Sequence, residues 1–247
     1  MKVFIIPRIK GILVFAFWMM LWHVASAVTS NTLVIVSPFS AFGRLSELAF
    51  ESFFWHSIGI SLGRIILGFL LALVIGVLLA ALSAANGIIY ALFRPLADTI
   101  KSVPVASFTI LALMWLNPAR LPLFIAFITV LPIVYFNTYE GIRNTDPKIL
   151  EMSALFNVPR WRRIRFIFFP STLPHVIAAA NAGLGFAFKS GIAAEVIGIA
   201  RNTIGFNLHT ARIFLQTRDV FAWTIAICIL SFVMERIFLL LLRKFSQ

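Results

Sequence analysis

Two ionisable residues, Lys189 and Glu195, lie inside or at the edge of an apolar segment that covers residues 175–199. Each would cost about 2.5–3.5 kcal/mol at the middle of a bilayer. On a continuous helix they point about 240° apart, so they pair directly only if the helix breaks at Gly191. Two interpretations stay open. One or both residues face a polar path or gate, or they reach the outer interface or join a structural ion pair.

Small residues recur at four-residue steps in the same segment, at Ala179, Gly183, Ala187 and Gly191. This spacing predicts a smooth helix face that another helix can approach closely in lipid. Such a face suits a span that lines a substrate path at the centre of a dimer, and ordinary packing within the chain is the alternative. Asn181 is a further candidate for the path, with an interhelical hydrogen bond as its alternative.

Other candidates for chemistry are sparse. The four histidines lie on different segments without i, i+4 spacing, which argues against a metal site. The single cysteine, Cys228, offers neither a disulfide framework nor a thiolate cluster. The sequence contains no G-x-x-x-x-G-K-[ST] phosphate loop, so any ATP must be hydrolysed by another polypeptide. We therefore expect no cofactor and no catalytic residue in this chain.

One basic, amphipathic stretch interrupts the apolar sequence at residues 151–170, EMSALFNVPRWRRIRFIFFP. Asp146 favours a helix N-terminus just before it, and Asn157 accepts the left-handed conformation at a helix C-terminus. Pro159 is suited to open a second helix, and Pro170 to close it. The stretch therefore predicts two short helices joined by a turn.

The spacing within this stretch resembles a cytoplasmic loop of solute-importing ABC permeases. That loop has the pattern E-A-A, three residues, G, nine residues, I-x-L-P, and Glu151, Asn157, Ile167 and Pro170 fall on it. The sequence has Met-Ser for the two alanines, Asn for the glycine and Phe for the leucine. Asparagine keeps the backbone requirement, whereas the alanine changes alter packing at the contact surface.

The resemblance extends from about residue 37 to the C-terminus. The segments AAEVIG, at residues 193–198, and ARIFLQTRDVFAW are similar to the nitrate, sulfonate and taurine branch of these permeases. The resemblance implies the membrane-spanning subunit of a type I ABC importer. It also implies three partners: a cytoplasmic ABC ATPase dimer that binds ATP and Mg²⁺, a second permease copy, with a homodimer expected, and an extracytoplasmic solute-binding protein.

In this family the loop, about residues 140–172 here, would act as a coupling helix docked on the ATPase. Its apolar side chains would be anchors and its arginines would meet acidic or polar groups. The alternative is a basic loop that lies on anionic lipid. The residues expected to couple are Glu151, Ser153, Phe156, Asn157, Trp161, Arg163, Ile167 and Pro170.

The whole chain is far more apolar than a soluble domain, with 61% hydrophobic and only 12% charged residues. We expect an all-α, polytopic transmembrane bundle of about six spans in a single domain, residues 1–247. The expected spans cover residues 11–28, 57–83, 105–116, 121–139, 175–199 and 220–242. A small-residue site at Ala25, Ser26 and Ala27 leaves a cleaved signal peptide as the alternative for the first span.

The connections between these spans carry their own expectations. Residues 40–53 predict an amphipathic helix at the outer interface. Pro95 and Pro104 are expected to break residues 88–103 into an inner connector, and Pro132 to interrupt the fourth span. Residues 200–219 are polar and predict an irregular outer segment.

Most of the 21 lysines and arginines fall in the N-terminal segment, the 88–103 connector, the 140–172 loop and the C-terminal end. Six spans place these segments on one side, which the positive-inside bias makes the cytoplasmic side of a bacterial inner membrane. Both termini are then cytoplasmic. The net charge of +12 thus indicates orientation and contact with lipid, and we expect no nucleic-acid partner.

Two other classes of protein remain as alternatives to an importer. An intramembrane enzyme needs convergent polar groups at one depth, which this sequence hardly offers. An ion-coupled secondary transporter needs carboxylates within its spans and no ATPase. The solute itself stays open between a small organic anion such as a sulfonate and a vitamin precursor.

Overall fold

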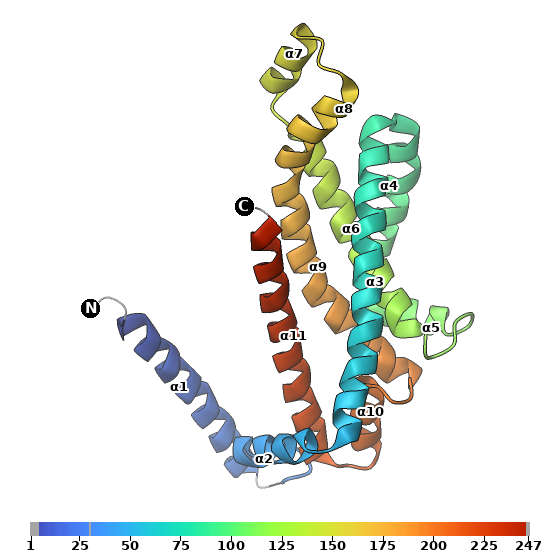
Figure 1. Cartoon of the computed structure of the whole chain (residues 1–247). Coiled ribbons are helices and arrows are strands. Elements are labelled where there is room, and N and C mark those ends of the chain that lie inside the picture. Colours follow the sequence, from blue (N-terminus) through green and yellow to red (C-terminus); the bar gives the residue numbers. More distant parts are fainter. Residues whose placement is uncertain (1–4, 30, 246–247) are drawn as a thin grey trace.

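The computed structural model describes residues 5–29 and 31–245, and the regular elements in these residues are all helical (Figure 1). This confirms the all-α fold class. Lys2, part of the basic N-terminal segment, lies outside the described residues. The elements are α1 Ile5–Thr29, α2 Pro38–Ala49, α3 Ser52–Ala85, α4 Gly87–Ser102, α5 Val105–Ala112, α6 Leu121–Arg143, α7 Pro147–Leu155, α8 Arg160–Arg163, a π-helical turn Ile164–Phe168, α9 Phe169–Gly198, α10 Ile204–Ile213 and α11 Thr217–Phe245.

Five helical segments in the described residues are long and apolar enough to cross a membrane. They are Gly11–Thr29, Ser52–Ala85, Leu121–Arg143, Arg160–Gly198 and Thr217–Leu240. The third expected span is different, because α5 has only eight residues and extends about 12 Å. Helices α4 and α5, separated by a break at Val103 and Pro104, take the place of the third expected span.

The prolines at positions 95 and 132 do not break their helices, contrary to expectation. Pro95 lies inside α4 and Pro132 lies buried inside α6. A proline removes one backbone hydrogen bond, whereas unwinding the helix around it would remove several. The continuous helix therefore remains the better solution at both sites.

The core of the bundle is formed by α3, α6 and α9. Phe69, Val130 and Ala187, one from each helix, are each at most 1% exposed. Two glycines on α3, Gly68 and Gly76, let α3 and α6 approach closely. A Cβ on Gly68 would lie 2.3 Å from the carbonyl oxygen of Leu123, so no larger residue fits there without a shift of the helices.

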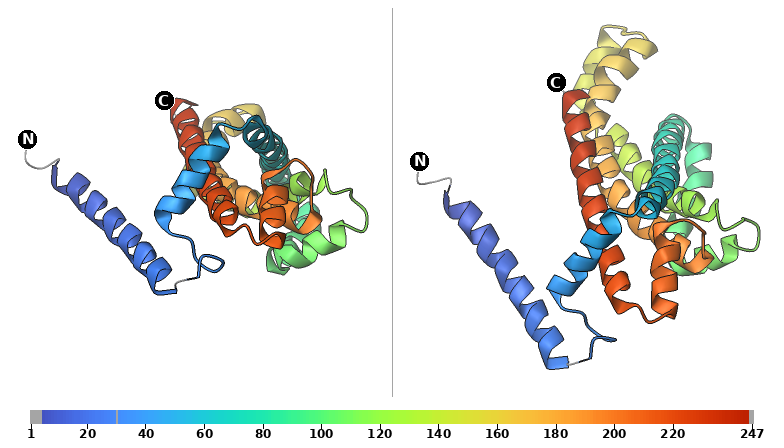
Figure 2. Two further views of the ribbon diagram at one scale, coloured as in Figure 1. Left: turned by 90° about the horizontal axis from the view of Figure 1, so that it is seen from below. Right: turned by 60° about the horizontal axis from the view of Figure 1, so that its bottom comes forward.

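The two ends of the bundle differ. The hairpin of α7 and α8 extends beyond the bundle at the end where α11 finishes, and α2 and α10 lie at the opposite end (Figures 1 and 2). Helix α1 leans away from the bundle in both figures. Its C-terminal half is tethered where Trp22 Nε1 donates to the carbonyl of Val36 at 3.0 Å and its ring stacks on Phe221. The small-residue site around Ser26 lies inside α1.

Helix α2 ends earlier than expected, at Ala49. Glu51 adopts an extended conformation, and α3 begins at the next residue, Ser52. Its Arg44 forms an ion pair with Asp219, which fastens α2 to the start of α11. This carboxylate raises the pKa of Arg44 above its usual value, so the guanidinium stays charged at physiological pH. The expected irregular segment 200–219 also contains a helix, α10, which begins where the Thr203 hydroxyl accepts a hydrogen bond from Phe206 N.

Candidate functional site

The α7–α8 hairpin begins and turns through local contacts. Asp146 caps α7 by accepting a hydrogen bond from Lys148 N at 2.9 Å. Asn157 has φ 48°, and Val158 N donates to the carbonyl of Ser153 across the turn at 3.0 Å. The predicted pair of helices and the left-handed asparagine are therefore confirmed.

Pro170 does not close the second helix, and this expectation was wrong. The chain continues from α8 through the π-helical turn Ile164–Phe168 directly into α9. Phe169 N donates to the carbonyl of Ile164, five residues earlier. A proline ring crowds the carbonyl four residues before it, here that of Phe166, and the wider π turn relieves this contact. The hairpin is thus connected to the bundle by an unbroken helical arm.

The hairpin exposes large apolar side chains beyond the end of the bundle. Leu155, Phe156 and Trp161 are exposed by 81, 77 and 69%. Side chains of this size rarely remain free at an aqueous face without a partner. Leu155 was missed by the sequence analysis, because a leucine in an apolar chain gives no separate signal.

The other predicted coupling residues divide by exposure. Glu151, Asn157 and Pro170 are exposed, and Ile167 and Arg163 are partly buried. Ser153 is only 2% exposed, and its hydroxyl donates to the carbonyl of Leu150, so it is part of the hairpin interior and not of its outer surface. Within the described residues, none of the four arginines of the hairpin has a carboxylate within ion-pair distance; these are Arg160, Arg162, Arg163 and Arg165.

The stripe of small residues on α9 packs inside the chain. Ala179, Gly183, Ala187 and Gly191 are all buried. A Cβ on Gly183 would lie 2.9 Å from Val130 on α6, and one on Gly191 would lie 2.6 Å from Ile65 on α3. The structure therefore places the stripe at an intramolecular contact and leaves no part of it facing outward to a second copy.

Glu195 and Lys189 lie in different environments. Because α9 is continuous through Gly191, the two side chains project from different sides of the helix. Lys189 is exposed, and its ammonium lies 5.9 Å from the centre of the Phe186 ring. Glu195 is fully buried, and its Oε2 accepts hydrogen bonds from Ser61 Oγ and Gly205 N, both at 2.9 Å.

The surroundings of Glu195 form a junction between three helices. Ser61 on α3 also accepts a hydrogen bond from Ile204 N at the start of α10, at 3.0 Å. A Cβ on Gly205 would lie 2.3 Å from the Cβ of Glu195, so the glycine is needed for this approach. The geometry is that of a structural clamp. Asn181 is partly exposed, and its Oδ1 is buried without a hydrogen-bond partner.

A cleft of about 480 Å³ opens between the α4–α5 break, α6 and α9. Its walls are mainly apolar, with Lys101, Thr129 and Asn137 as polar members. From α9 it takes Ala182 and Phe186, neighbours of the predicted Asn181 and Gly183. No sequence pattern predicts this cleft, because the cleft is formed by the packing of segments that are distant in sequence. The lining residues are Ile100, Lys101, Val103, Val105, Phe108, Ile128, Thr129, Pro132, Ile133, Phe136, Asn137, Ala182 and Phe186.

Comparison with known families gives one match that covers most of the chain. Residues 72–247 match the model of the family described as binding-protein-dependent transport system inner membrane component. The matched segment includes the hairpin, the cleft and Glu195, but not α1, α2 or the N-terminal part of α3.

Similar curated proteins are permeases. One from Bacillus subtilis (strain 168), assigned to aliphatic sulfonate transport, is 28% identical over 95% of this chain and 86% of its own length. The taurine transport system permease of Escherichia coli (strain K12) is 21% identical over 87% of this chain and 80% of its own. The bicarbonate transport system permease of Synechococcus elongatus is 25% identical over 84% of this chain and 77% of its own.

A solved structure shares the fold. The crystal structure of an amino acid ABC transporter with histidines superposes with a TM-score of 0.65 at 18% sequence identity. The match covers 86% of this chain and 99% of that chain.

Proposed function

The chain belongs to the family of binding-protein-dependent transport system inner membrane components, and from this premise we propose how its surfaces share the work of transport. It is a multi-pass membrane permease of an ABC importer, not an enzyme, and ATP is hydrolysed by a separate subunit. We propose that residues 1–247 act as a single permease domain, and that the α7–α8 hairpin is its contact with the ATPase.

The exposed apolar cluster on the hairpin is the observation that supports this assignment. Phe156 and Trp161 extend beyond the bundle and are exposed by 77 and 69%. Aromatic side chains that fill a pocket on a partner usually carry much of the binding energy. The unpaired arginines beside them favour a partner with acidic or polar groups around that pocket. A loop that only lay on anionic lipid would need the arginines but not this projecting apolar cluster.

The unbroken arm between hairpin and bundle supports the mechanical part of the proposal. A movement of the hairpin would pass through the π-helical turn into α9, which packs on both α3 and α6. ATP binding and hydrolysis on the partner, with Mg²⁺ bound there, would thus bias the bundle between outward-open and inward-open states.

Orientation and stoichiometry complete the proposal. We place the hairpin and both chain termini on the cytoplasmic side, in keeping with the positive-inside bias. The end that carries α2 and α10 would then meet a solute-loaded binding protein. A second copy of this chain is proposed as the other half of the transport unit, because an importer needs a path enclosed on all sides.

For the solute we propose a small anion such as an alkyl sulfonate. The curated relatives support this class, since the names of the three described above refer to sulfonates, taurine and bicarbonate. A vitamin precursor is the alternative for a permease of this branch, and the uptake assay described below separates the two.

The coupling role is tested by combining Phe156→Ala with Trp161→Ala and purifying the permease with its ATPase. Loss of two aromatic side chains that the ATPase would bury should weaken ATPase binding by a factor of at least roughly 30. Trp115→Ala is the matched control, because this tryptophan is equally exposed but lies in the α5–α6 connection. A double variant that retains its ATPase like the control would contradict the proposal.

Combining Glu151→Ala with Arg163→Glu tests the same surface through charge and should also release the ATPase. Uptake by the wild-type protein in ATP-free vesicles with an imposed ion gradient would favour a secondary transporter. Uptake that needs ATP inside the vesicles with the ATPase bound supports the importer.

A further inference from the structure

The cleft lies near the middle of the membrane-spanning bundle. Its members on α6 begin at Ile128, seven residues after the start of the helix, and end at Asn137, six residues before Arg143. At 1.5 Å per residue, each limit is about 10 Å from the nearest end of α6. This wall of the cleft therefore lies at the depth of the hydrocarbon layer and not at either end of the helix.

The cleft is bounded on one side by the break between α4 and α5. Val103 lines it between the end of α4 and the start of α5. Non-helical backbone at membrane depth is tolerated where it is covered by protein or lines a water-filled cavity. A broken crossing is also a common place for the binding sites of membrane transporters.

Lys101 is the positive charge of this cleft. It lies in the last turn of α4, and its ammonium is 5.8 Å from the centre of the Phe136 ring. The nearest acid along α4, Asp98, is turned to Arg94 at 3.8 Å. Within the described residues Lys101 has no ion-pair partner. Its side chain is exposed beside the apolar ring of Phe136, and a charged ammonium is costly against lipid, so an aqueous cleft is its favourable environment.

Two neighbours add to the polar character of the cleft. Asn137 uses one N–H to donate to the carbonyl of Ile133 at 2.8 Å, which leaves its second N–H and its carbonyl oxygen for a ligand. Lys189 lies over Phe186, whose ring lines the cleft, and so brings a second positive charge close to it. The other walls are apolar, as in most small-molecule sites.

We propose that this cleft is a transit site for a small anion. Lys101 provides the counter-charge for a sulfonate or carboxylate group, Asn137 donates a hydrogen bond to it, and Phe108 and Ile133 face its apolar part. The site rests on the proposed function, because it concerns the solute that the importer carries. It assigns selectivity for charge to the permease itself, in addition to any binding protein.

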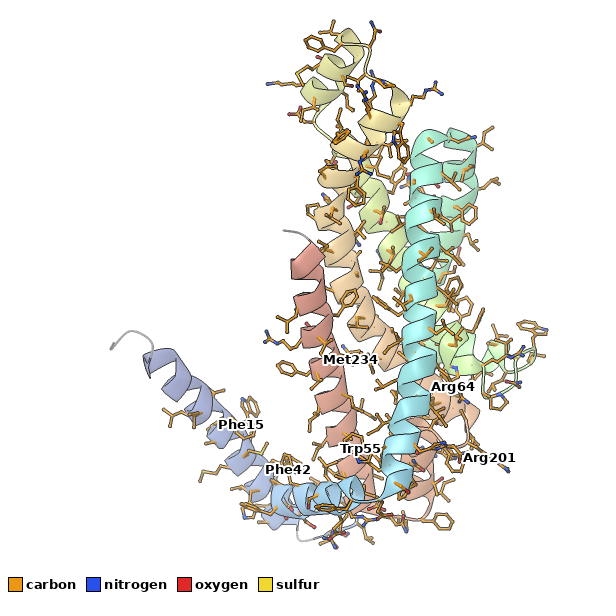
Figure 3. All side chains as sticks on the ribbon, viewed as in Figure 1. Phe15, Phe42, Trp55, Arg64, Arg201 and Met234 are labelled. Carbon is orange, nitrogen blue, oxygen red and sulfur yellow. The ribbon has the colours of Figure 1, made fainter. Side chains whose placement is uncertain are left out.

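The first test is uptake by the complete complex in proteoliposomes, with its ATPase and binding protein, and radiolabelled taurine and ethanesulfonate as probes. Lys101→Gln should lower uptake about 10-fold or more, since a charge-assisted contact is lost. Lys101→Arg should restore most of it. Arg236→Gln is the control, because Arg236 is an exposed basic residue on α11, two positions after Met234 (Figure 3), and it does not line the cleft.

The outcomes separate the site from the function. Wild-type complex that imports the two sulfonates, with Lys101→Gln equal to it, overturns the transit site and leaves the importer intact. Wild-type complex that imports a cationic vitamin precursor but neither sulfonate overturns the proposed solute class. Basal ATP hydrolysis, measured on each variant, shows that the complex has assembled.

The second test measures water and electrostatic potential in the cleft without transport. Asn137→Cys in a Cys228→Ser background should react with an anionic, sulfonate-bearing methanethiosulfonate reagent faster than with a trimethylammonium one. Adding Lys101→Gln should remove this preference. Val74→Cys, which is 57% exposed on α3 but outside the cleft, is the control and should react slowly. Equal reactivity at positions 137 and 74, or no change on adding Lys101→Gln, would overturn the inference.

Discussion

Glu195 joins three helices through one carboxylate. Its Oε2 receives hydrogen bonds from Ser61 on α3 and from Gly205 at the start of α10, while Glu195 itself belongs to α9. Without these donors, a carboxylate in the bundle would have a large desolvation penalty. The same contacts fix the turn between α9 and α10, where Ile199 adopts a left-handed conformation. The residue therefore acts as a structural clamp at the end of the bundle that carries α10.

Ser61→Ala tests this clamp at the scale of one hydroxyl. The substitution removes a donor to Glu195 and the acceptor of Ile204 N, so it should destabilise the fold by about 1–3 kcal/mol. Thermal unfolding of the detergent-purified protein measures this as a lower Tm. The control is Ser46→Ala, because Ser46 is exposed and its hydroxyl donates to the carbonyl of Gly43 in its own helix. Equal Tm values for the two variants would contradict the clamp.

Residue-level features were predictable where their cause is local. The cap at Asp146 and the left-handed Asn157 depend on a few neighbouring residues, so the sequence sufficed. The partner of Glu195 is 134 positions away, and no pattern in one sequence points to Ser61. Ser153 fits the spacing of the family loop, but which side of α7 turns inward depends on how the hairpin folds back.

At the scale of elements, the π-helical turn determines how the hairpin is presented. It adds one residue to a helical turn between α8 and α9, which rotates the hairpin about the helix axis by about 100° relative to a regular helix. Pro170 is the steric cause, because its ring excludes the regular hydrogen-bonding pattern. The direction in which Phe156 and Trp161 point thus depends on a proline in another element.

Pro170→Ala should convert the turn to regular helix and rotate the hairpin. The expected result is a changed distance between spin labels at Leu155→Cys and Phe232→Cys, in a Cys228→Ser background, and less solute imported per ATP hydrolysed. Pro174→Ala is the control, since Pro174 lies inside α9 beyond the π turn. Unchanged label distances in Pro170→Ala would show that the turn has another cause.

Most spans could be predicted from the sequence, whereas their continuity could not. Long apolar runs made α3, α6 and α11 plain. The prolines were misleading, because a proline in an apolar run can either end a helix or be accommodated within it. Pro132 lies inside the continuous α6, whereas Pro104 precedes the first residue of α5, although both lie at or next to the cleft. That difference belongs to tertiary packing.

At the scale of the whole molecule, the two ends carry different tasks. One end presents the basic hairpin, which finds no acidic partner in the described residues. The other end presents α2 and α10, which both pack on α11, and the Arg44–Asp219 ion pair joins α2 to it. Between them the cleft and the buried Glu195 lie at successive levels along the bundle. Such an arrangement suits a protein whose driving force enters at one end and whose solute enters at the other.

The orientation of these ends can be measured with single cysteines in sealed vesicles, in a Cys228→Ser background. Leu155→Cys on the hairpin should react with a membrane-impermeant maleimide only in inside-out vesicles, because positive charge favours the cytoplasmic side. Phe214→Cys, 68% exposed between α10 and α11, should react only in right-side-out vesicles. The reverse pattern would place the hairpin outside the cell, where no ATP-hydrolysing partner could drive it. Since both positions are exposed on the isolated chain, a difference in labelling reports the side of the membrane and not burial in the fold.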